Sequence, residues 1–141
     1  MNYEELFAPV LENARKAYEE GKVVPAAYEH AFRTAGDEKW KCCAIGAYIY
    51  ERDASLVDSD YRSYSRFQDL DEIRGSLDFI TKAAEQLESG REDVAHFEFG
   101  FDAGFLGLDW EALCKTRRDL RKGPAKVGYG FGVEVAAKYK K

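Results

Sequence analysis

The least charged stretch of this chain is Trp40–Tyr50, which reads Trp-Lys-Cys-Cys-Ala-Ile-Gly-Ala-Tyr-Ile-Tyr and carries a charge only at Lys41. Asp37 precedes it at the position of an N-cap, and Arg52 lies at its polar end. Apolar residues recur at helical spacing on two adjacent faces, and the run is longer than most buried strands. The pattern predicts a helix over Asp37–Arg52 that is buried on nearly all sides. We therefore expect this helix to lie at the centre of a helical bundle.

The composition is typical of one globular domain. The chain has 141 residues, of which 45% are hydrophobic and 33% are charged, and its 9 Phe and 9 Tyr residues contrast with a single Met. A chain of this length can bury enough surface for an ordinary core. We expect a single α-helical domain over residues 1–141 with a stiff aromatic core.

The cysteines and the N-terminus predict the cellular compartment. Cys42 and Cys43 are adjacent, which does not allow an ordinary disulfide between them, and the odd total of three leaves at least one thiol free. The N-terminal segment is acidic, and the chain contains no long apolar run. We expect a cytoplasmic protein without a signal peptide or a membrane span.

Five further helices are predicted from apolar periodicity and from capping residues. They are Tyr3–Glu20, Pro25–Ala35, Leu70–Leu87, Arg91–Leu106 and Asp109–Lys122. Between the central helix and the third of these, Ala54–Gln68 shows no helical period. We predict a long loop there, with a short strand pair as the alternative.

Glycines recur every four residues in two segments. Gly100 and Gly104 precede a second pair, Gly128 and Gly132, in Lys126–Tyr139. Each glycine inside a helix costs about 1 kcal/mol relative to alanine, so we expect the two segments to be helices whose backbones approach closely. Large and small residues also alternate in the last segment, which leaves a short C-terminal strand as the alternative. The predicted fold class is an all-α single-domain bundle of six or seven helices.

The net charge of −5 is unevenly distributed along the chain. Residues 1–110 carry 12 Lys and Arg against 23 Asp and Glu, a net charge of −11, and residues 111–141 carry 9 against 3, a net charge of +6. The basic segment either packs against the acidic remainder or binds an anionic partner such as a nucleic acid. The candidate anion-binding residues are Lys115, Arg117, Arg118, Arg121, Lys122 and Lys126.

Tyrosine and arginine side chains are concentrated in the predicted loop. Both residue types dominate the binding hot spots of protein interfaces. These side chains either fold back onto the core or bind a partner protein. The candidate partner-binding residues are Tyr61, Arg62, Tyr64, Arg66 and Phe67.

No metal-binding or catalytic motif stands out. His30 and His96 are far apart, whereas zinc ligands usually lie closer together in sequence. Cysteines in the predicted buried helix would be inert, which disfavours a catalytic Cys–His pair. Four carboxylates between residues 92 and 109 are expected on a solvated helix face. These carboxylates are Glu92, Glu98, Asp102 and Asp109. We therefore predict no catalytic residue, metal or cofactor.

Three phrases of the sequence resemble small helical proteins of unknown role in phages and other mobile elements. They are Trp40–Ala47, the phenylalanine- and glycine-rich phrase at 97–105, and Gly-Leu-Asp-Trp at 107–110. The resemblance implies a setting in which short proteins bind host machinery. We predict a non-enzymatic protein that binds or inhibits a partner protein, as a monomer or a homodimer. Binding of nucleic acid or nucleotide through the basic C-terminal helix is the alternative function.

Overall fold

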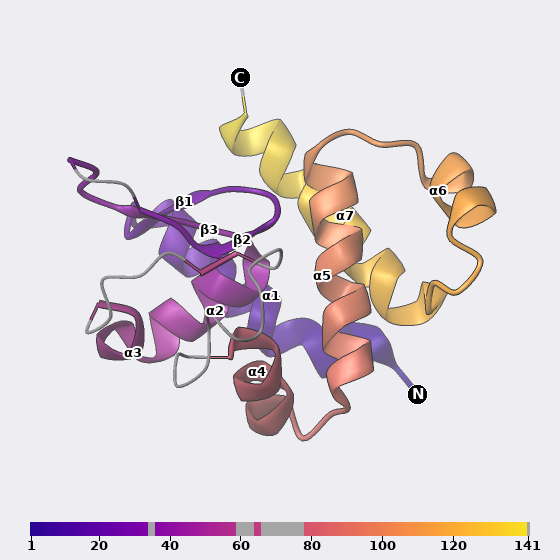
Figure 1. Ribbon diagram of the computed structural model, residues 1–141, viewed down its shortest axis with the longest axis horizontal. Helices are drawn as coiled ribbons and strands as arrows, with labels where there is room; N and C mark the ends of the chain where they lie inside the picture. The colour runs from indigo at the N-terminus through magenta and orange to yellow at the C-terminus, as the bar shows by residue number, and fades with distance from the viewer. Residues whose placement is uncertain (34–35, 59–63, 66–77, 141) are drawn as a thin grey trace.

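The computed structural model describes residues 1–33, 36–58, 64–65 and 78–140, and these contain seven helices and four short strands (Figure 1). The helices are α1 (Tyr3–Glu19), α2 (Ala44–Arg52), α3 (Ala54–Asp58), α4 (Phe79–Leu87), α5 (Arg91–Phe105), α6 (Trp110–Thr116) and α7 (Lys122–Tyr139). The strands are β1 (Val23–Pro25), β2 (Glu29–Ala31), β3 (Trp40–Cys42) and β4 (Tyr64–Ser65). The protein is therefore rich in helix, as predicted.

The main core is shared by helices from both halves of the chain. Phe7 of α1 stacks on Phe97 of α5, with ring centroids 4.4 Å apart. Six consecutive residues of α2, from Ala44 to Ile49, are buried. Phe131 of α7 belongs to the same cluster of buried side chains. The apolar stretch that is least charged in the sequence is thus packed inside the molecule.

The pair formed by α5 and α7 is in direct backbone contact. Figure 1 shows these two helices side by side, with α6 on the outer side of the pair. A Cβ atom on Gly100 would lie 1.9 Å from the backbone oxygen of Ala125, and one on Gly104 would lie 2.2 Å from that of Tyr129. The predicted helix over 126–139 and the predicted close approach through glycine are both confirmed.

Helices α1 and α7 run side by side in the same direction. Near their N-termini, the ring of Tyr3 packs on Gly123, so that a Cβ atom there would lie 2.5 Å from the ring. Near their C-termini, Lys138 Nζ lies 2.7 Å from Glu19 Oε1. Helices α1 and α7 therefore contact each other near both of their ends.

The predicted helix Pro25–Ala35 is wrong. The segment forms β1 and β2. Pro25 is the last residue of β1, a position at which a strand tolerates proline although proline has no N–H to donate. β1 pairs in parallel with β3, with Val23 opposite Trp40. Neighbouring backbone groups bond outside any helix, since Phe32 N donates to Lys41 O at 2.9 Å. Pairing with a distant segment has outweighed local helical periodicity here.

The predicted start of the Asp37–Arg52 helix is also wrong. Trp40–Cys42 forms strand β3, and α2 begins at Ala44 with Cys43 as its N-cap. The large side chain of Trp40 suits a buried strand, where it is 1% exposed and donates from Nε1 to Asp58 Oδ1 at 2.9 Å. This later start places the Cys43 side chain at the end of a helix rather than inside one.

Three other predicted elements differ in extent. The predicted loop over 54–68 contains the short helix α3 and strand β4, and β4 pairs with β2 of an earlier segment rather than within the loop. Helix α4 begins after its N-cap Asp78, nine residues later than predicted, and residues 66–77 lie outside the described part of the chain. Helix α6 has the predicted Asp109 cap but ends at Thr116.

Candidate functional site

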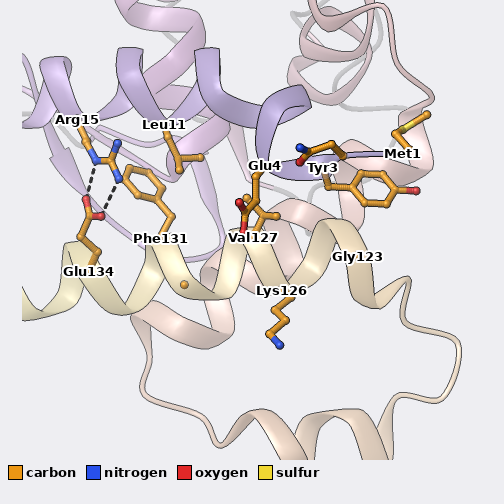
Figure 2. A pocket seen from close by; sticks show the side chains of 12 residues that line it. Met1, Tyr3, Glu4, Leu11, Arg15, Gly123, Lys126, Val127, Phe131 and Glu134 are labelled. Atoms are coloured by element: carbon orange, nitrogen blue, oxygen red, sulfur yellow. Dashed lines mark hydrogen bonds and ion pairs between the residues drawn. The ribbon is translucent and has the colours of Figure 1, made fainter.

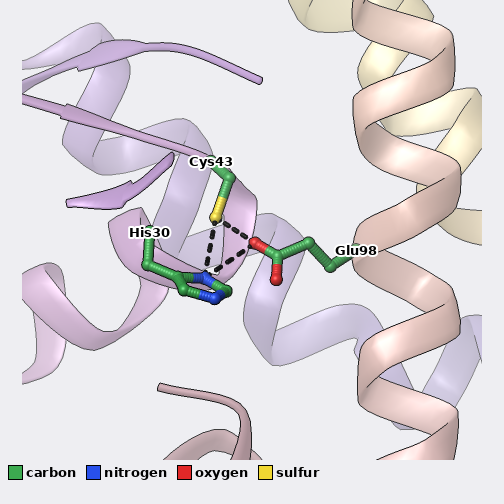
Figure 3. Close-up of side chains that lie close together, drawn as sticks. All are labelled: His30, Cys43 and Glu98. Carbon is green, nitrogen blue, oxygen red and sulfur yellow. Dashed lines mark hydrogen bonds and ion pairs between the residues drawn. The ribbon is translucent and has the colours of Figure 1, made fainter. Parts of the chain in front are cut away.

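A buried cluster of one histidine, one cysteine and one glutamate lies where three elements meet (Figure 3). His30 comes from β2, Cys43 caps α2, and Glu98 comes from the middle of α5. These residues are 8%, 0% and 3% exposed, respectively. One nitrogen, the sulfur and one carboxylate oxygen all lie within 4.8 Å of one another. Residues far apart in sequence thus present three different donor atoms to one small volume.

A glycine in α2 allows β2 to reach this position. A Cβ atom on Gly46 would lie 1.5 Å from the backbone oxygen of His30, so any larger residue would push the strand away. The Cys43 N–H donates to Glu29 O at 2.6 Å, which attaches β2 to the N-terminus of α2. The phrase Cys-Cys-Ala-Ile-Gly at 42–46 therefore supplies both a cluster residue and the space beside it.

Hydrogen bonds join the three side chains. His30 Nδ1 lies 3.0 Å from Glu98 Oε1, and the Cys43 thiol donates to the same oxygen. Cys43 Sγ lies 3.6 Å from His30 Nδ1 and accepts the Gly46 N–H at 3.4 Å. The imidazole stacks on Phe79 at 5.3 Å with an interplanar angle of 9°. The ring is therefore held with Nδ1 toward the cysteine and the glutamate.

A second carboxylate lies one helical turn beyond Glu98. Asp102 is 1% exposed, and its Oδ1 accepts the backbone N–H of Tyr28 at 3.0 Å. Tyr28 has a positive φ of 65°, which is uncommon for a residue other than glycine. Asp102 thus contacts the backbone two residues before His30.

The electrostatic environment keeps the Cys43 thiol protonated. Burial raises its pKa well above the ordinary value, and the negative charges of Glu98 and Asp102 raise it further. A thiol with this shift is a poor nucleophile, although it lies beside a histidine. A cation bound between these groups would have the opposite effect, because it stabilises a thiolate and compensates the buried carboxylate charge. The arrangement is therefore better suited to holding a cation than to nucleophilic catalysis.

A separate groove lies on the surface between α1 and α7 (Figure 2). It has a volume of about 760 Å³, and its apolar lining includes Leu11, Val127 and Phe131. Arg15 and Glu134, which also line the groove, form two hydrogen bonds of 2.7 Å, from Nε to Oε2 and from Nη2 to Oε1. An apolar surface bordered by charges is thus exposed to solvent.

Most of the predicted partner-binding residues lie outside the described part of the chain. Tyr61, Arg62, Arg66 and Phe67 belong to this group. Tyr64 is described as part of β4, where it is paired with Ala31 of β2. The predicted role of this segment stays a prediction.

The predicted anion-binding residues are distributed over several surroundings. Arg117 bonds to Asp119 at 3.0 and 3.2 Å, and Arg121 Nε lies 2.8 Å from Asp93 Oδ1. A hollow beside Trp110 brings two of the set together, namely Lys115 and Lys122, whereas Lys126 lines the α1–α7 groove. Arg118 is exposed. The Arg121–Asp93 pair joins the basic segment to the acidic remainder of the chain and favours the packing interpretation, whereas Arg117 and Asp119 both belong to the basic segment.

The cluster was missed in the sequence for identifiable reasons. Glu98 and Asp102 were expected on a solvated helix face, and the structure corrects this, because both are buried among the core residues of α5. The sequence did contain a signal of this burial, because positions 94, 98 and 102 share one helical face and position 94 is the apolar Val94. Cys43 lies beside His30, a residue 13 positions away that no motif in the sequence connects with it. His96 instead accepts the backbone N–H of Arg121 at 3.1 Å.

Comparison of the chain with models of known protein families gives no match, and no curated protein or solved structure is significantly similar to it. None of the described helices is both long enough and apolar enough to cross a membrane.

Proposed function

We propose that this protein binds a divalent metal ion of the zinc class through His30 Nδ1, Cys43 Sγ and Glu98 Oε1. The observation that carries the proposal is the convergence of these three donor atoms within 4.8 Å at a buried junction of β2, α2 and α5. Nitrogen, sulfur and carboxylate oxygen are the donors that zinc takes in proteins.

The two donor separations that involve His30 Nδ1 are close to those around a small tetrahedral ion, whereas Cys43 Sγ and Glu98 Oε1 are hydrogen-bonded to each other and would have to move apart to hold it. Zinc bonds of about 2.0 Å to nitrogen and oxygen and about 2.3 Å to sulfur separate neighbouring donors by roughly 3.3 to 3.6 Å. The separation of Cys43 Sγ from His30 Nδ1 is 3.6 Å, and that of His30 Nδ1 from Glu98 Oε1 is 3.0 Å. A thiolate ligand favours zinc over magnesium or calcium, which prefer oxygen donors.

The proposed ion has a structural role. It would connect β2, α2 and α5, whose ligands are separated by 13 residues between His30 and Cys43 and by 55 between Cys43 and Glu98. A ligand that binds only the folded state stabilises it by about 2.7 kcal/mol at a free concentration one hundred times its dissociation constant. Removal of the ion should therefore lower the melting temperature.

The test is reconstitution of the purified apoprotein with Co²⁺, whose spectrum reports a thiolate ligand, together with elemental analysis after zinc loading. We expect one metal ion per chain and a thiolate-to-cobalt absorption band. Cys43→Ala should abolish the band, whereas the matched variant Cys42→Ala should keep it, since Cys42 lies outside the cluster. His30→Ala and His96→Ala form a second matched pair. Wild-type protein that takes up no metal, or metal uptake that survives Cys43→Ala, would contradict the proposal.

The second candidate function is the one predicted from the sequence, non-enzymatic binding or inhibition of a partner protein in the cytoplasm. The apolar groove between α1 and α7 favours it, because an exposed groove of this kind can accept part of a partner. The partner is a different protein or a second copy of this chain. A pull-down compares wild type with two variants. The double variant Tyr61→Ala, Tyr64→Ala tests the predicted partner-binding segment, and Val127→Lys tests the groove. Equal recovery of partners by wild type and both variants would contradict this function.

A further inference from the structure

The most unusual backbone conformation near the cluster is that of Tyr28. Of the described residues other than glycine, only Tyr28 and Glu88 have a positive φ, at 65° and 53° respectively. Glu88 is the C-cap of α4, where left-handed residues are common. Tyr28 lies instead in the turn between β1 and β2, two residues before His30. Strained conformations away from helix ends are often maintained at functional sites, where the surrounding structure holds them.

The group that holds Tyr28 is Asp102. Its Oδ1 accepts the Tyr28 N–H at 3.0 Å, and it is 1% exposed, so competition from water is small. Asp102 follows Glu98 by four residues on α5, and residues at this spacing lie on the same helix face. One face of α5 therefore contacts both the cluster and the turn that leads into β2.

We infer that Asp102 is a positioning residue of the metal site, which fixes the left-handed turn at Tyr28 and thereby directs His30 toward Cys43 and Glu98. This inference rests on the proposed metal-binding function. Residues that hold metal ligands in place through hydrogen bonds typically change metal affinity by about 10-fold to 100-fold when they are replaced. Asp102 acts in this way on the backbone that carries the ligand.

Two ways in which Asp102 could affect the metal are separated by a conservative variant. Asp102→Asn removes the negative charge but keeps an oxygen that can accept the Tyr28 N–H. Asp102→Ala removes both. If the hydrogen bond positions His30, Asp102→Asn should keep an affinity close to wild type, whereas Asp102→Ala should lose about 10-fold to 100-fold. Equal losses in the two variants would show that Asp102 acts through its charge and would overturn the inference.

A second pair of variants tests the turn itself. Glycine adopts a positive φ without a steric penalty, so Tyr28→Gly no longer needs Asp102 to hold this conformation. In the Asp102→Ala background, Tyr28→Gly should recover part of the lost affinity, and Tyr28→Ala should recover none. Glu88→Gly is the matched control, because it relieves the other positive φ and lies outside the cluster. Recovery by Glu88→Gly as large as that by Tyr28→Gly would overturn the inference.

The measurement is Co²⁺ affinity by competition with a chelator of known affinity, with the cobalt absorption spectrum as the signature of an intact ligand set. Far-UV circular dichroism checks that each variant is folded. Should Asp102→Ala fold poorly, Asp102→Leu replaces it, because leucine is similar in size to aspartate but cannot accept the Tyr28 N–H, and wild-type affinity in folded Asp102→Leu overturns the inference. Wild-type protein that fails to bind Co²⁺ contradicts the proposed function as well. Normal wild-type binding with unchanged affinity in Asp102→Ala contradicts the positioning role alone.

Discussion

A Cβ atom on Gly128 of α7 would lie 1.9 Å from the backbone oxygen of Phe97 in α5. The relationship is reciprocal, because Gly100 of α5 makes the same close approach to Ala125 of α7. No flexible side chain intervenes in either contact, so neither helix can yield without moving its backbone. The separation of α5 and α7 is therefore set by glycine.

Gly128→Ala should destabilise the protein by at least about 2 kcal/mol, because overpacking against a fixed backbone forces the helices apart. Gly130→Ala is the control in the same helix, since a Cβ atom there would meet nothing within 4 Å. Higher helix propensity should make this control neutral or stabilising by up to about 1 kcal/mol. Urea unfolding measures both changes. Similar stabilities of the two variants would show that the helices are not in backbone contact.

Gly46→Ala should disrupt the cluster from the side of α2. The added methyl group would overlap the backbone oxygen of His30, so β2 must move away from Cys43. We expect lower stability in urea and loss of Co²⁺ binding, with Gly130→Ala again as the control. Metal binding at wild-type affinity by folded Gly46→Ala would contradict the assignment of His30 as a ligand.

The ion pair of Arg15 and Glu134 should make stability depend on pH in the acid range. Hydrogen bonds from Arg15 lower the pKa of the Glu134 carboxyl, although burial opposes them, and the charges of Arg15 and Lys138 lower it further. A folded-state pKa below the unfolded value gives stability that is present above about pH 4.5 and is lost as the pH falls through the folded pKa.

Glu134→Gln should therefore be less stable than wild type near neutral pH and should converge with it at low pH. The two side chains are 43% and 46% exposed, so the difference should be at most about 1 kcal/mol. Thermal unfolding between pH 2.5 and pH 7, a range of about two units on either side of the ordinary pKa, measures it. Glu85→Gln on α4 is the control. A difference that is independent of pH would contradict an electrostatic role for the pair.

Arg121→Ala should lower the urea midpoint more than Arg118→Ala. Arg121 Nε lies 2.8 Å from Asp93 Oδ1, and this carboxylate is largely buried, so loss of the arginine leaves it without this neighbouring positive charge. Arg118 is exposed and serves as the matched control. If the basic segment instead serves an anionic partner, Arg118→Ala and Arg121→Ala should leave stability equal and should both reduce retention on heparin.

The elements that the sequence predicted correctly are those whose signals are local. α1, α5 and α7 have an apolar face at helical spacing, and the glycine spacing in α5 and α7 indicated their contact. The segment from Pro25 to Cys42 was mispredicted because its backbone bonds to distant partners. β1 pairs with β3 across an intervening segment that contains β2, and no periodicity within either strand reports that pairing.

The candidate site could not be predicted for the same reason. The predicted helix included Cys43, whereas α2 starts after it, so the neighbours expected for its side chain were wrong. His30 was assigned to a helix, whereas its position depends on a left-handed residue at Tyr28 that is neither glycine nor asparagine. Glu98 could have been found from its position on the apolar face of α5, had burial rather than charge been given the greater weight.

The packing of α1 against α7 has a consequence for synthesis of the protein on the ribosome. The Arg15–Glu134 and Glu19–Lys138 pairs each join residues that are 119 positions apart. Phe7 of α1 also shares one core with Phe131 and Val135 of α7. Helix α1 therefore leaves the ribosome long before α7 has been translated, and the part of its apolar face that meets α7 stays uncovered until then. The core is in this sense complete only once α7 has been made.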